Sequence, residues 1–257
     1  MKELFPVIFH KRRPNIISIR SNCSNKKSNN AQTIAVIMCT WDRIKRLKKT
    51  IELLEKQIGV NLDFYIWNNN NKYIDNINSI IERHTNIKIQ VTHSKYNIGG
   101  FGRFFIAKKI AKNHDKVIFI DDDQIFNKNM AVMFLEEFKK RTIHSFWAFN
   151  LNSEKSYWDR RPGEPGERVK YCGTGGMICD TSIFLDKELY LCPKRFWFVE
   201  DLWLSYFADK KGWKLFKSSN SAITIEHDLK ELNLKLRKTK TRFLRYLVKR
   251  KKWNISA

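Results

Sequence analysis

The sequence has neither the long apolar runs of a membrane protein nor the paired cysteines of a disulfide-stapled one. No apolar run approaches the roughly 18 residues that a membrane-spanning helix needs. The apolar segment Leu4–Phe9 is short, and no small-residue cleavage pattern follows it, so we expect no signal peptide. The five cysteines are odd in number and form no C-x-x-C pair. A reducing, cytoplasmic compartment is therefore the simpler interpretation.

Acidic residues are scarce as well. The chain has 26 Asp and Glu against 49 Lys and Arg, a formal net charge of +23. Such a balance suggests an anionic partner, namely nucleic acid, a membrane surface or a phosphate-bearing substrate. A bias toward Lys, Asn and Ile can also arise from AT-rich coding, so charge alone does not choose a partner. With 257 residues, of which 42% are hydrophobic and 13% aromatic, the chain can bury a sizeable core.

The chain divides into three parts. A polar run at Ser21–Asn30 indicates a linker, so residues 1–30 form an N-terminal extension. Residues 31–228 alternate apolar strand patterns with helical ones, and residues 229–257 form a basic tail. Four short apolar runs predict buried strands: Thr33–Cys39, Phe64–Trp67, Ile87–Val91 and Val117–Ile120. This alternation predicts an α/β fold, with a single Rossmann-like, mainly parallel sheet and helices on both faces.

Three adjacent carboxylates, Asp121, Asp122 and Asp123, follow the last of these strands directly. They should therefore lie at its carboxyl end, where open α/β sheets bind their ligands. Three neighbouring negative charges repel one another, and a divalent cation would relieve the repulsion. Carboxylate oxygens suit Mg²⁺ or Mn²⁺, which in turn hold phosphates. A solvated acidic turn is the structural alternative.

An ordered set of motifs resembles family-two glycosyltransferases of the A-type fold, the nucleotide-diphospho-sugar transferase fold. The resemblance covers about residues 33–228. VIFIDDD resembles the strand and D-x-D motif of these enzymes, and FVEDLWLSYFA resembles their Glu-Asp motif at a helix start. The other four similar segments are AVIMCTWDR, YIWNNNN, NIGGFGR and YCGTGGMI, at residues 35–43, 65–71, 97–103 and 171–178.

The resemblance implies a role for each matching residue. Asp201 would be the catalytic base, and Glu200 would be the next candidate or would bind acceptor hydroxyls. Asp121, Asp123 and His227 would hold the metal, Mn²⁺ or Mg²⁺. Asp122 is grouped with the donor site, although alternation along an extended segment would turn it away from its neighbours. The remaining donor-binding residues would be Thr40, Asp42, Asn68, Asn69, Asn97, Gly99, Arg103, Asp121, Gly175 and Gly176. Among them, Asn68 and Asn69 would approach the base, and Gly175 and Gly176 belong to the loop that would lie under the donor sugar.

The basic tail holds eleven Lys and Arg and one Glu between Lys230 and Lys252, interleaved with Leu, Phe and Trp. A helix of this kind can lie on an anionic membrane. It can equally pack against the catalytic domain and leave its basic face in solvent.

The leading hypothesis is a metal-dependent inverting glycosyltransferase. It would move a sugar from a nucleotide-sugar, most simply a UDP-sugar, to a hydroxyl of a glycan, glycolipid or glycoprotein. The alternative enzyme is a sugar-phosphate nucleotidyltransferase, for which TWDR after the first strand is a poor match. A basic nucleic-acid-binding module is the alternative of another class, and it gives the strand-end aspartates no use.

Overall fold

The computed structural model describes residues 16–20, 32–84, 86–225 and 236–255. Within these residues, nine strands form one sheet in the order β1-β4-β3-β2-β5-β12-β7-β13-β10. The strands of the sheet are β1 (Ile16–Arg20), β2 (Thr33–Thr40), β3 (Asn61–Asn68), β4 (Lys88–Ser94), β5 (Lys116–Asp121), β7 (Thr142–Ser145), β10 (Arg168–Val169), β12 (Met177–Asp180) and β13 (Lys214–Lys217). The helices are α1 (Ile44–Glu55), α2 (Ile74–Glu82), α3 (Gly102–Ile110), α4 (Met130–Glu137), α5 (Glu200–Lys210) and α7 (Arg237–Lys251).

The centre of the sheet is parallel, and its strand order reverses beside β2. Strands β4, β3, β2 and β5 pair in parallel with their neighbours. From β2 the chain builds outward through β3 and β4, and β5 then returns to the opposite side of β2. Ligands of open α/β sheets bind beyond the carboxyl ends of the strands at such a reversal. The fold thus directs attention to the ends of β2 and β5.

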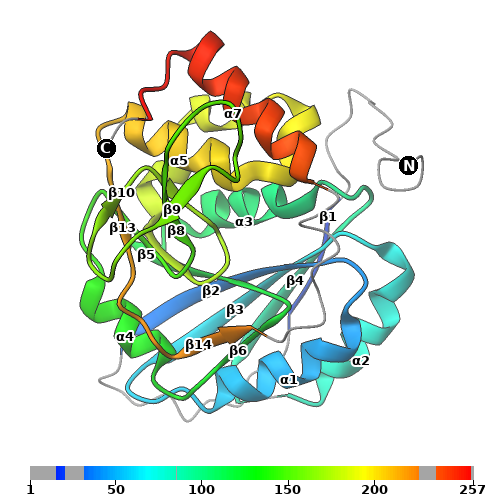
Figure 1. Ribbon diagram of the computed structural model, residues 1–257. Helices are drawn as coiled ribbons and strands as arrows, with labels where there is room; N and C mark the ends of the chain where they lie inside the picture. Colours follow the sequence, from blue (N-terminus) through cyan, green and yellow to red (C-terminus); the bar gives the residue numbers. More distant parts are fainter. Residues whose placement is uncertain (1–15, 21–31, 85, 226–235, 256–257) are drawn as a thin grey trace.

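Successive side chains of the central strands feed two separate cores, because neighbouring side chains of a strand point to opposite faces. Val36 and Ile118 belong to one core, with α1, α2 and α4. Ile37 and Phe119 belong to the other, with α3, α5 and α7. Figure 1 shows α1 and α2 on one side of the sheet and α3, α5 and α7 on the other. The predicted α/β class, with helices on both faces, is confirmed.

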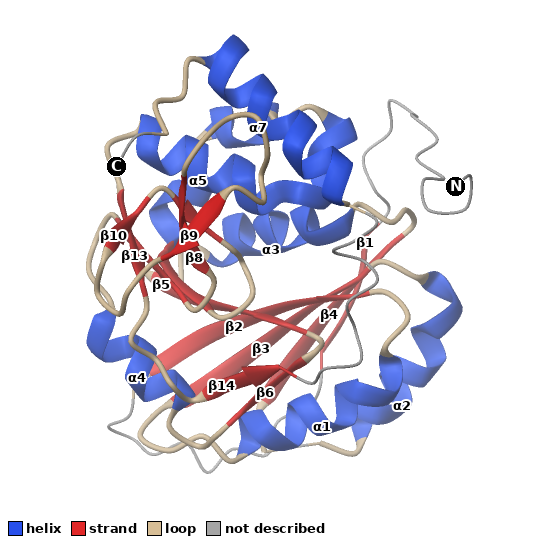
Figure 2. Cartoon of the chain, viewed as in Figure 1, coloured by secondary structure: helices blue, strands red, loops and turns tan. Residues whose placement is uncertain are grey.

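The second half of the sheet is built differently from the first. Strand β12 inserts antiparallel between β5 and β7, and β13 then runs parallel to β7. Two smaller sheets lie beside the large one (Figure 2). They consist of β8 (Ala148–Leu151), β9 (Arg160–Pro162) and β11 (Tyr171–Cys172), and of β6 (Gln124–Phe126) with β14 (Ile223–Ile225). The antiparallel entry of β12 carries the loop before it over the end of β5.

Helix α7 of the basic tail packs on the catalytic domain, while contact of its basic face with a membrane stays a prediction. Its side chains Phe243, Leu244 and Leu247 are fully buried, and Phe243 stacks on Phe196 with ring centroids 4.0 Å apart. The apolar face of the helix therefore packs on the domain next to α5. Its exposed side is basic, with Lys238, Arg242 and Arg245 among its members. Within the described residues, no helix is both long and apolar enough to cross a membrane.

Candidate active site

The candidate site lies where β2 and β5 end side by side. Cys39 of β2 pairs with Asp121, the last residue of β5. Both strands are buried apolar runs, so the first polar side chains appear where the strands leave the sheet. Thr40 and the acidic triplet stand at this edge. The acidic triplet therefore lies at a strand end, as predicted.

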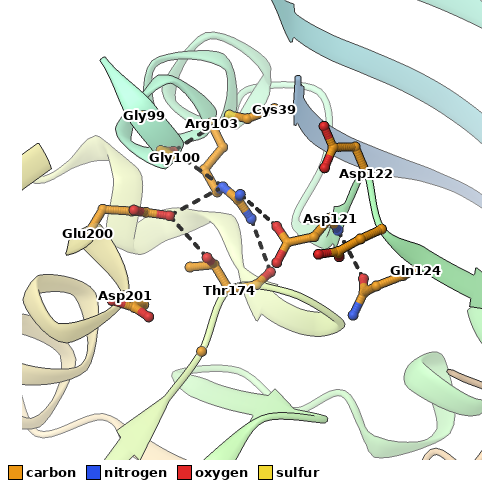
Figure 3. A network of polar contacts seen from close by, with 12 residues as sticks. Cys39, Gly99, Gly100, Arg103, Asp121, Asp122, Gln124, Thr174, Glu200 and Asp201 are labelled. Carbon is orange, nitrogen blue, oxygen red and sulfur yellow. Dashed lines mark hydrogen bonds and ion pairs between the residues drawn. The ribbon is translucent and has the colours of Figure 1, made fainter. Parts of the chain in front are cut away.

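A buried arginine connects three parts of the site (Figure 3). Arg103, in the first turn of α3, donates from Nη2 to Asp121 Oδ1 at 2.8 Å and from Nη1 to the carbonyl of Thr174 at 3.1 Å. Its Nε donates to the Gly100 carbonyl at 3.2 Å and lies 3.6 Å from Glu200 Oε1. Burial disfavours the guanidinium charge, but Asp121, Cys39 and Glu200 together outweigh burial, and the pKa of Arg103 is raised. A permanent positive charge is therefore held at the strand ends.

Two glycines let backbone and carboxylates approach closely. A Cβ at Gly175 would overlap the Asp121 carboxylate, and one at Gly100 would overlap the Glu200 carboxylate. Both acidic groups thus lie directly against glycine backbone. Gly175 and Gly176, which are predicted to lie beneath the donor sugar, belong to the loop that the structure brings against Asp121.

The three aspartates meet two arginines: Asp121 contacts Arg103, whereas Asp122 and Asp123 both contact Arg43. Asp122 accepts from Arg43 Nη1 at 2.7 Å and from Thr40 Oγ1 at 3.2 Å, and so faces the loop after β2. Burial raises the pKa of Asp122 to about 6, although Arg43 opposes the shift. Asp123 lies 3.3 Å from the same arginine. Burial, followed by the charge of Asp121, raises the pKa of Asp123. The carboxylates of Asp121 and Asp123 therefore repel each other.

This repulsion is the observation that bears on a metal. A divalent cation between two repelling carboxylates would stabilise both of them in the ionised form. Mg²⁺ is commonly bound by one or two carboxylates together with substrate phosphates. The described residues contain no group of three or more His, Cys, Asp or Glu side chains arranged to hold a metal ion. Asp121 and Asp123 fit such an ion as the protein's part of a site completed by substrate. His227, the third predicted ligand, lies outside the described residues.

Glu200 and Asp201 begin α5 but point to different surroundings. Glu200 Oε1 accepts from Thr174 Oγ1 at 3.0 Å beside Arg103. Burial raises the pKa of Glu200 to about 7 against the opposing charge of Arg103. Asp201 Oδ2 instead accepts from Tyr171 at 2.5 Å and lies 3.4 Å from Lys240 Nζ. Burial opposes ionisation of Asp201, but Lys240 and these hydrogen bonds lower its pKa overall.

The predicted base-recognition residues have internal partners. Asn68 is fully buried, and its amide bonds His93 and the backbone of Asn70. Asn69 accepts from Trp67 Nε1 and the amide of Ile98 and donates to the Gly99 carbonyl. Both amides therefore fix the turns after β3 and before α3, and their contact with a base stays a prediction.

The other predicted donor residues lie around the same edge. Asn97 Oδ1 accepts from the Gly99 amide at 2.9 Å and so stabilises the turn before α3. Gly99 and Gly176 have φ of +63° and +70°, a conformation that favours glycine. Asp42 is exposed beside Arg43. Gly176 lies next to Gln124, since a Cβ added at Gly176 would be 3.3 Å from Gln124 Nε2.

Sequence reasoning missed several residues of the site. Gln124 accepts from the Asp121 amide through Oε1, while its buried Nε2 has no hydrogen-bond partner among the described residues and lies beside the Gly175–Gly176 backbone. Thr174 bridges Arg103 and Glu200. Arg43, Tyr171 and Lys240 were also missed. Gln124 follows the triplet directly and could have been found there, whereas Lys240 stood in a tail with ten other basic residues.

The comparisons with known proteins identify the family. The profile of Glycosyl transferase family 2 matches residues 35–190. The chain belongs to this family. The match spans β2 to β12 and includes the acidic triplet, Arg103 and the Gly175–Gly176 loop. This family assignment supports neither the nucleotidyltransferase nor the nucleic-acid-binding alternative. No curated protein sequence matches the chain.

Solved structures resemble this family-2 chain in fold. GalNAc-T7 with UDP, GalNAc and Mn²⁺ has a TM-score of 0.61 at 14% identity, over 77% of this chain and 44% of that one. A mannosyltransferase of Pyrobaculum calidifontis with GDP-Man and Mn²⁺ has a TM-score of 0.58 at 12% identity, over 83% and 62%. Residues 1–349 of TarS from S. aureus with UDP have a TM-score of 0.51 at 17% identity, over 74% and 59%. This chain thus spans less than two thirds of each of these chains.

Proposed function

We propose that this family-2 chain is a metal-dependent, inverting glycosyltransferase that uses a nucleotide-sugar donor. The observation that carries the proposal is the ion pair of buried Arg103 with half-exposed Asp121 at the ends of β2 and β5, with Glu200 and the glycine loop around it. The similar folds named above hold UDP, GDP-Man and Mn²⁺. A UDP-sugar is the simplest donor, and Asp121 and Asp123 would hold Mn²⁺ or Mg²⁺.

The donor would lie over the glycine loop. The bound metal would stabilise the negative charge that develops on the departing nucleoside diphosphate. Arg103 fixes the orientation of Asp121 and adds positive charge beside that diphosphate. Nε2 of Gln124, which has no partner among the described residues, would donate a hydrogen bond to an oxygen of the nucleotide-sugar. The reason is that a buried N–H without a partner costs roughly 1–3 kcal/mol. The glycines at 175 and 176 leave space for that approach.

The acceptor would be activated by Asp201. This carboxylate is ionised at neutral pH and still has a lone pair available beyond its contacts with Tyr171, Lys240 and the Leu202 amide. It would accept the proton of the acceptor hydroxyl, whose oxygen then attacks the anomeric carbon opposite the leaving diphosphate and inverts the configuration. Glu200 would stabilise Arg103 and the loop at Thr174, and it is the second candidate for the base.

The acceptor would be a hydroxyl of a glycan, glycolipid or glycoprotein. The exposed basic side of α7 is a surface for an anionic membrane that carries such an acceptor. Because the large apolar side chains of α7 are buried, this contact would be electrostatic and would disappear at high salt. Cosedimentation with anionic vesicles at low salt, lost at high salt, is the expected result. Binding that persists at high salt would contradict it.

The central experiment separates donor binding from transfer. A thermal-shift screen of nucleoside diphosphates with Mn²⁺ identifies the base, since a ligand of the native state raises stability. UDP release from the matching nucleotide-sugar is then measured for Asp201→Asn and Glu200→Gln. Asp201→Asn should keep the thermal shift and lose about 10²–10⁴-fold in rate. Full activity of Asp201→Asn together with loss in Glu200→Gln would transfer the base role to Glu200.

A further inference from the structure

Asp201 and three other polar side chains form a closed ring. Tyr171 donates to Asp201 Oδ2, and Tyr157 donates to the Tyr171 hydroxyl at 2.9 Å. Lys240 Nζ lies 3.4 Å from both the Tyr157 hydroxyl and Asp201 Oδ2. The ring joins α5, β11, the segment before β9, and α7.

Lys240 does not behave like the other basic residues of its helix. Its relative exposure is 8%, whereas Lys238 and Arg242 on the same helix are exposed. Burying a lysine ammonium is costly unless a partner compensates for the lost hydration. The partners present are the Asp201 carboxylate, the Tyr157 hydroxyl and the Tyr157 ring, whose centroid is 4.8 Å from Nζ. The charge is therefore compensated mainly by the carboxylate at the start of α5.

We propose that Lys240 of the C-terminal helix is a positioning residue for the catalytic base, which holds the Asp201 carboxylate ionised and in one orientation through the Tyr171–Tyr157 ring. The proposal rests on the base role assigned to Asp201 above. It makes α7 part of the active site, although this helix lies beyond the region that the family profile matches. The two tyrosines fix the carboxylate oxygen and Lys240 supplies the charge.

The charged groups around Asp201 determine the sign of the effect. Lys240 faces it from α7, Tyr171 from β11, and Glu200 is its neighbour on α5. Arg160 of β9 also faces the ring, with its guanidinium 4.1 Å from the centroid of Tyr157. Its positive charge repels that of Lys240 and acts to lower the pKa of Lys240. Of these groups, Lys240 and Tyr171 favour ionised Asp201, and Glu200 opposes it. Loss of Lys240 should therefore raise the pKa of Asp201.

The first measurement is independent of activity. The ¹³Cγ resonance of Asp201 is assigned by its loss in Asp201→Asn and is followed against pH in the parent and in Lys240→Met. The midpoint should rise by at least about one pH unit, since an opposite charge within about 4–6 Å shifts a carboxyl by this amount. Lys238→Met removes an equal charge from the exposed side of α7 and should leave the midpoint unchanged. An unchanged midpoint in Lys240→Met would overturn the proposal.

The second measurement connects the charge to the reaction. In Lys240→Met, the acid limb of the pH profile of UDP release should move to higher pH by the same amount, while the thermal shift with UDP and Mn²⁺ is retained. A moved midpoint with an unmoved acid limb would leave Lys240 with a structural role only and overturn its part in catalysis. Full activity of Asp201→Asn would instead refute the base role, and the resonance titration would still report on the ion pair.

A variant that keeps hydrogen bonding guards against misfolding. If Lys240→Met does not fold, Lys240→Gln removes the charge and keeps a polar side chain. Tyr171→Phe removes one hydrogen bond to Asp201 with no change of charge on α7 and should move the midpoint in the same direction by less. No movement in either folded variant would overturn the proposal.

Discussion

Glu200 and Asp201 are adjacent in the chain, yet their carboxylates belong to separate hydrogen-bond networks. Glu200 contacts Thr174 and Arg103 beside the strand ends (Figure 3). Asp201 instead contacts Tyr171 and Lys240 of α7. The two environments move their pKa values in opposite directions. Neighbouring acids with separated pKa values are a common arrangement for distinct roles in one site. Asp201 is ionised throughout the neutral range, whereas Glu200 titrates within it.

The first prediction concerns the pH dependence of stability. Burial raises the pKa of Glu200 from 4.5 to about 7, so folding favours its protonated form. The stability that this group contributes is complete below its unfolded pKa and is lost as pH rises through about 7. Between these limits the parent should lose up to about 1.4 kcal/mol per pH unit relative to Glu200→Gln. Urea unfolding at several pH values measures the difference, and parallel curves for the two proteins would refute it.

The second prediction concerns the metal. Asp123→Asn keeps one oxygen but removes the negative charge that holds a divalent cation, so it should weaken UDP binding in Mn²⁺ about tenfold or more. Calorimetry of UDP with Mn²⁺ and with EDTA measures this. Asp115→Asn, at the opposite end of β5 with 64% side-chain exposure, is the matched control and should change nothing. Equal affinity of the parent with Mn²⁺ and with EDTA would refute metal dependence.

The third prediction uses the glycine beside Asp121. In Gly175→Ala the new Cβ would overlap the Asp121 carboxylate, which must then move away from its position beside Arg103. Since small displacements in an active site can cost on the order of 10²-fold, UDP affinity in Mn²⁺ should fall at least about tenfold. Gly173→Ala, in the same loop, is the control. The atoms nearest to its new Cβ belong to Trp147 and Tyr171, and Asp121 is not among them. Unchanged affinity in Gly175→Ala would mean that nucleotide binds elsewhere.

The fourth prediction concerns α7. Phe243 is fully buried and stacks on Phe196, so Phe243→Ala should reduce the free energy of unfolding by about 3–5 kcal/mol. Arg242→Ala changes the neighbouring exposed residue and should have little effect. Chemical denaturation of both variants makes the comparison. A loss below about 1 kcal/mol in Phe243→Ala would indicate a helix that detaches easily from the domain.

Much of the fold followed from local pattern. Continuous apolar runs of strand length, such as Val117–Ile120, require burial on both faces, and this indicated a parallel sheet under two layers of helices. A polar triplet directly after such a run must stand at the edge of the sheet, so the location of Asp121 was predictable. The antiparallel entry of β12 was not, because a four-residue strand carries no sign of its direction.

What the sequence by itself determined is therefore the class of the fold, the edge at which the acidic residues gather and the family motifs in their order. Only the tertiary structure decided which groups meet there. Arg103 of α3 meets Asp121 at the end of β5 and Glu200 at the start of α5. Lys240 meets Asp201, which lies 39 positions away in the chain. Helical spacing alone places Lys240 on the apolar face, four residues after Leu236 and three before Phe243, but composition and spacing do not show which carboxylate it meets. The apolar face of α7 packs next to α5 and carries Lys240 inward together with Phe243 and Leu244. There Lys240 meets the carboxylate of Asp201, because the two helices lie side by side in the folded chain.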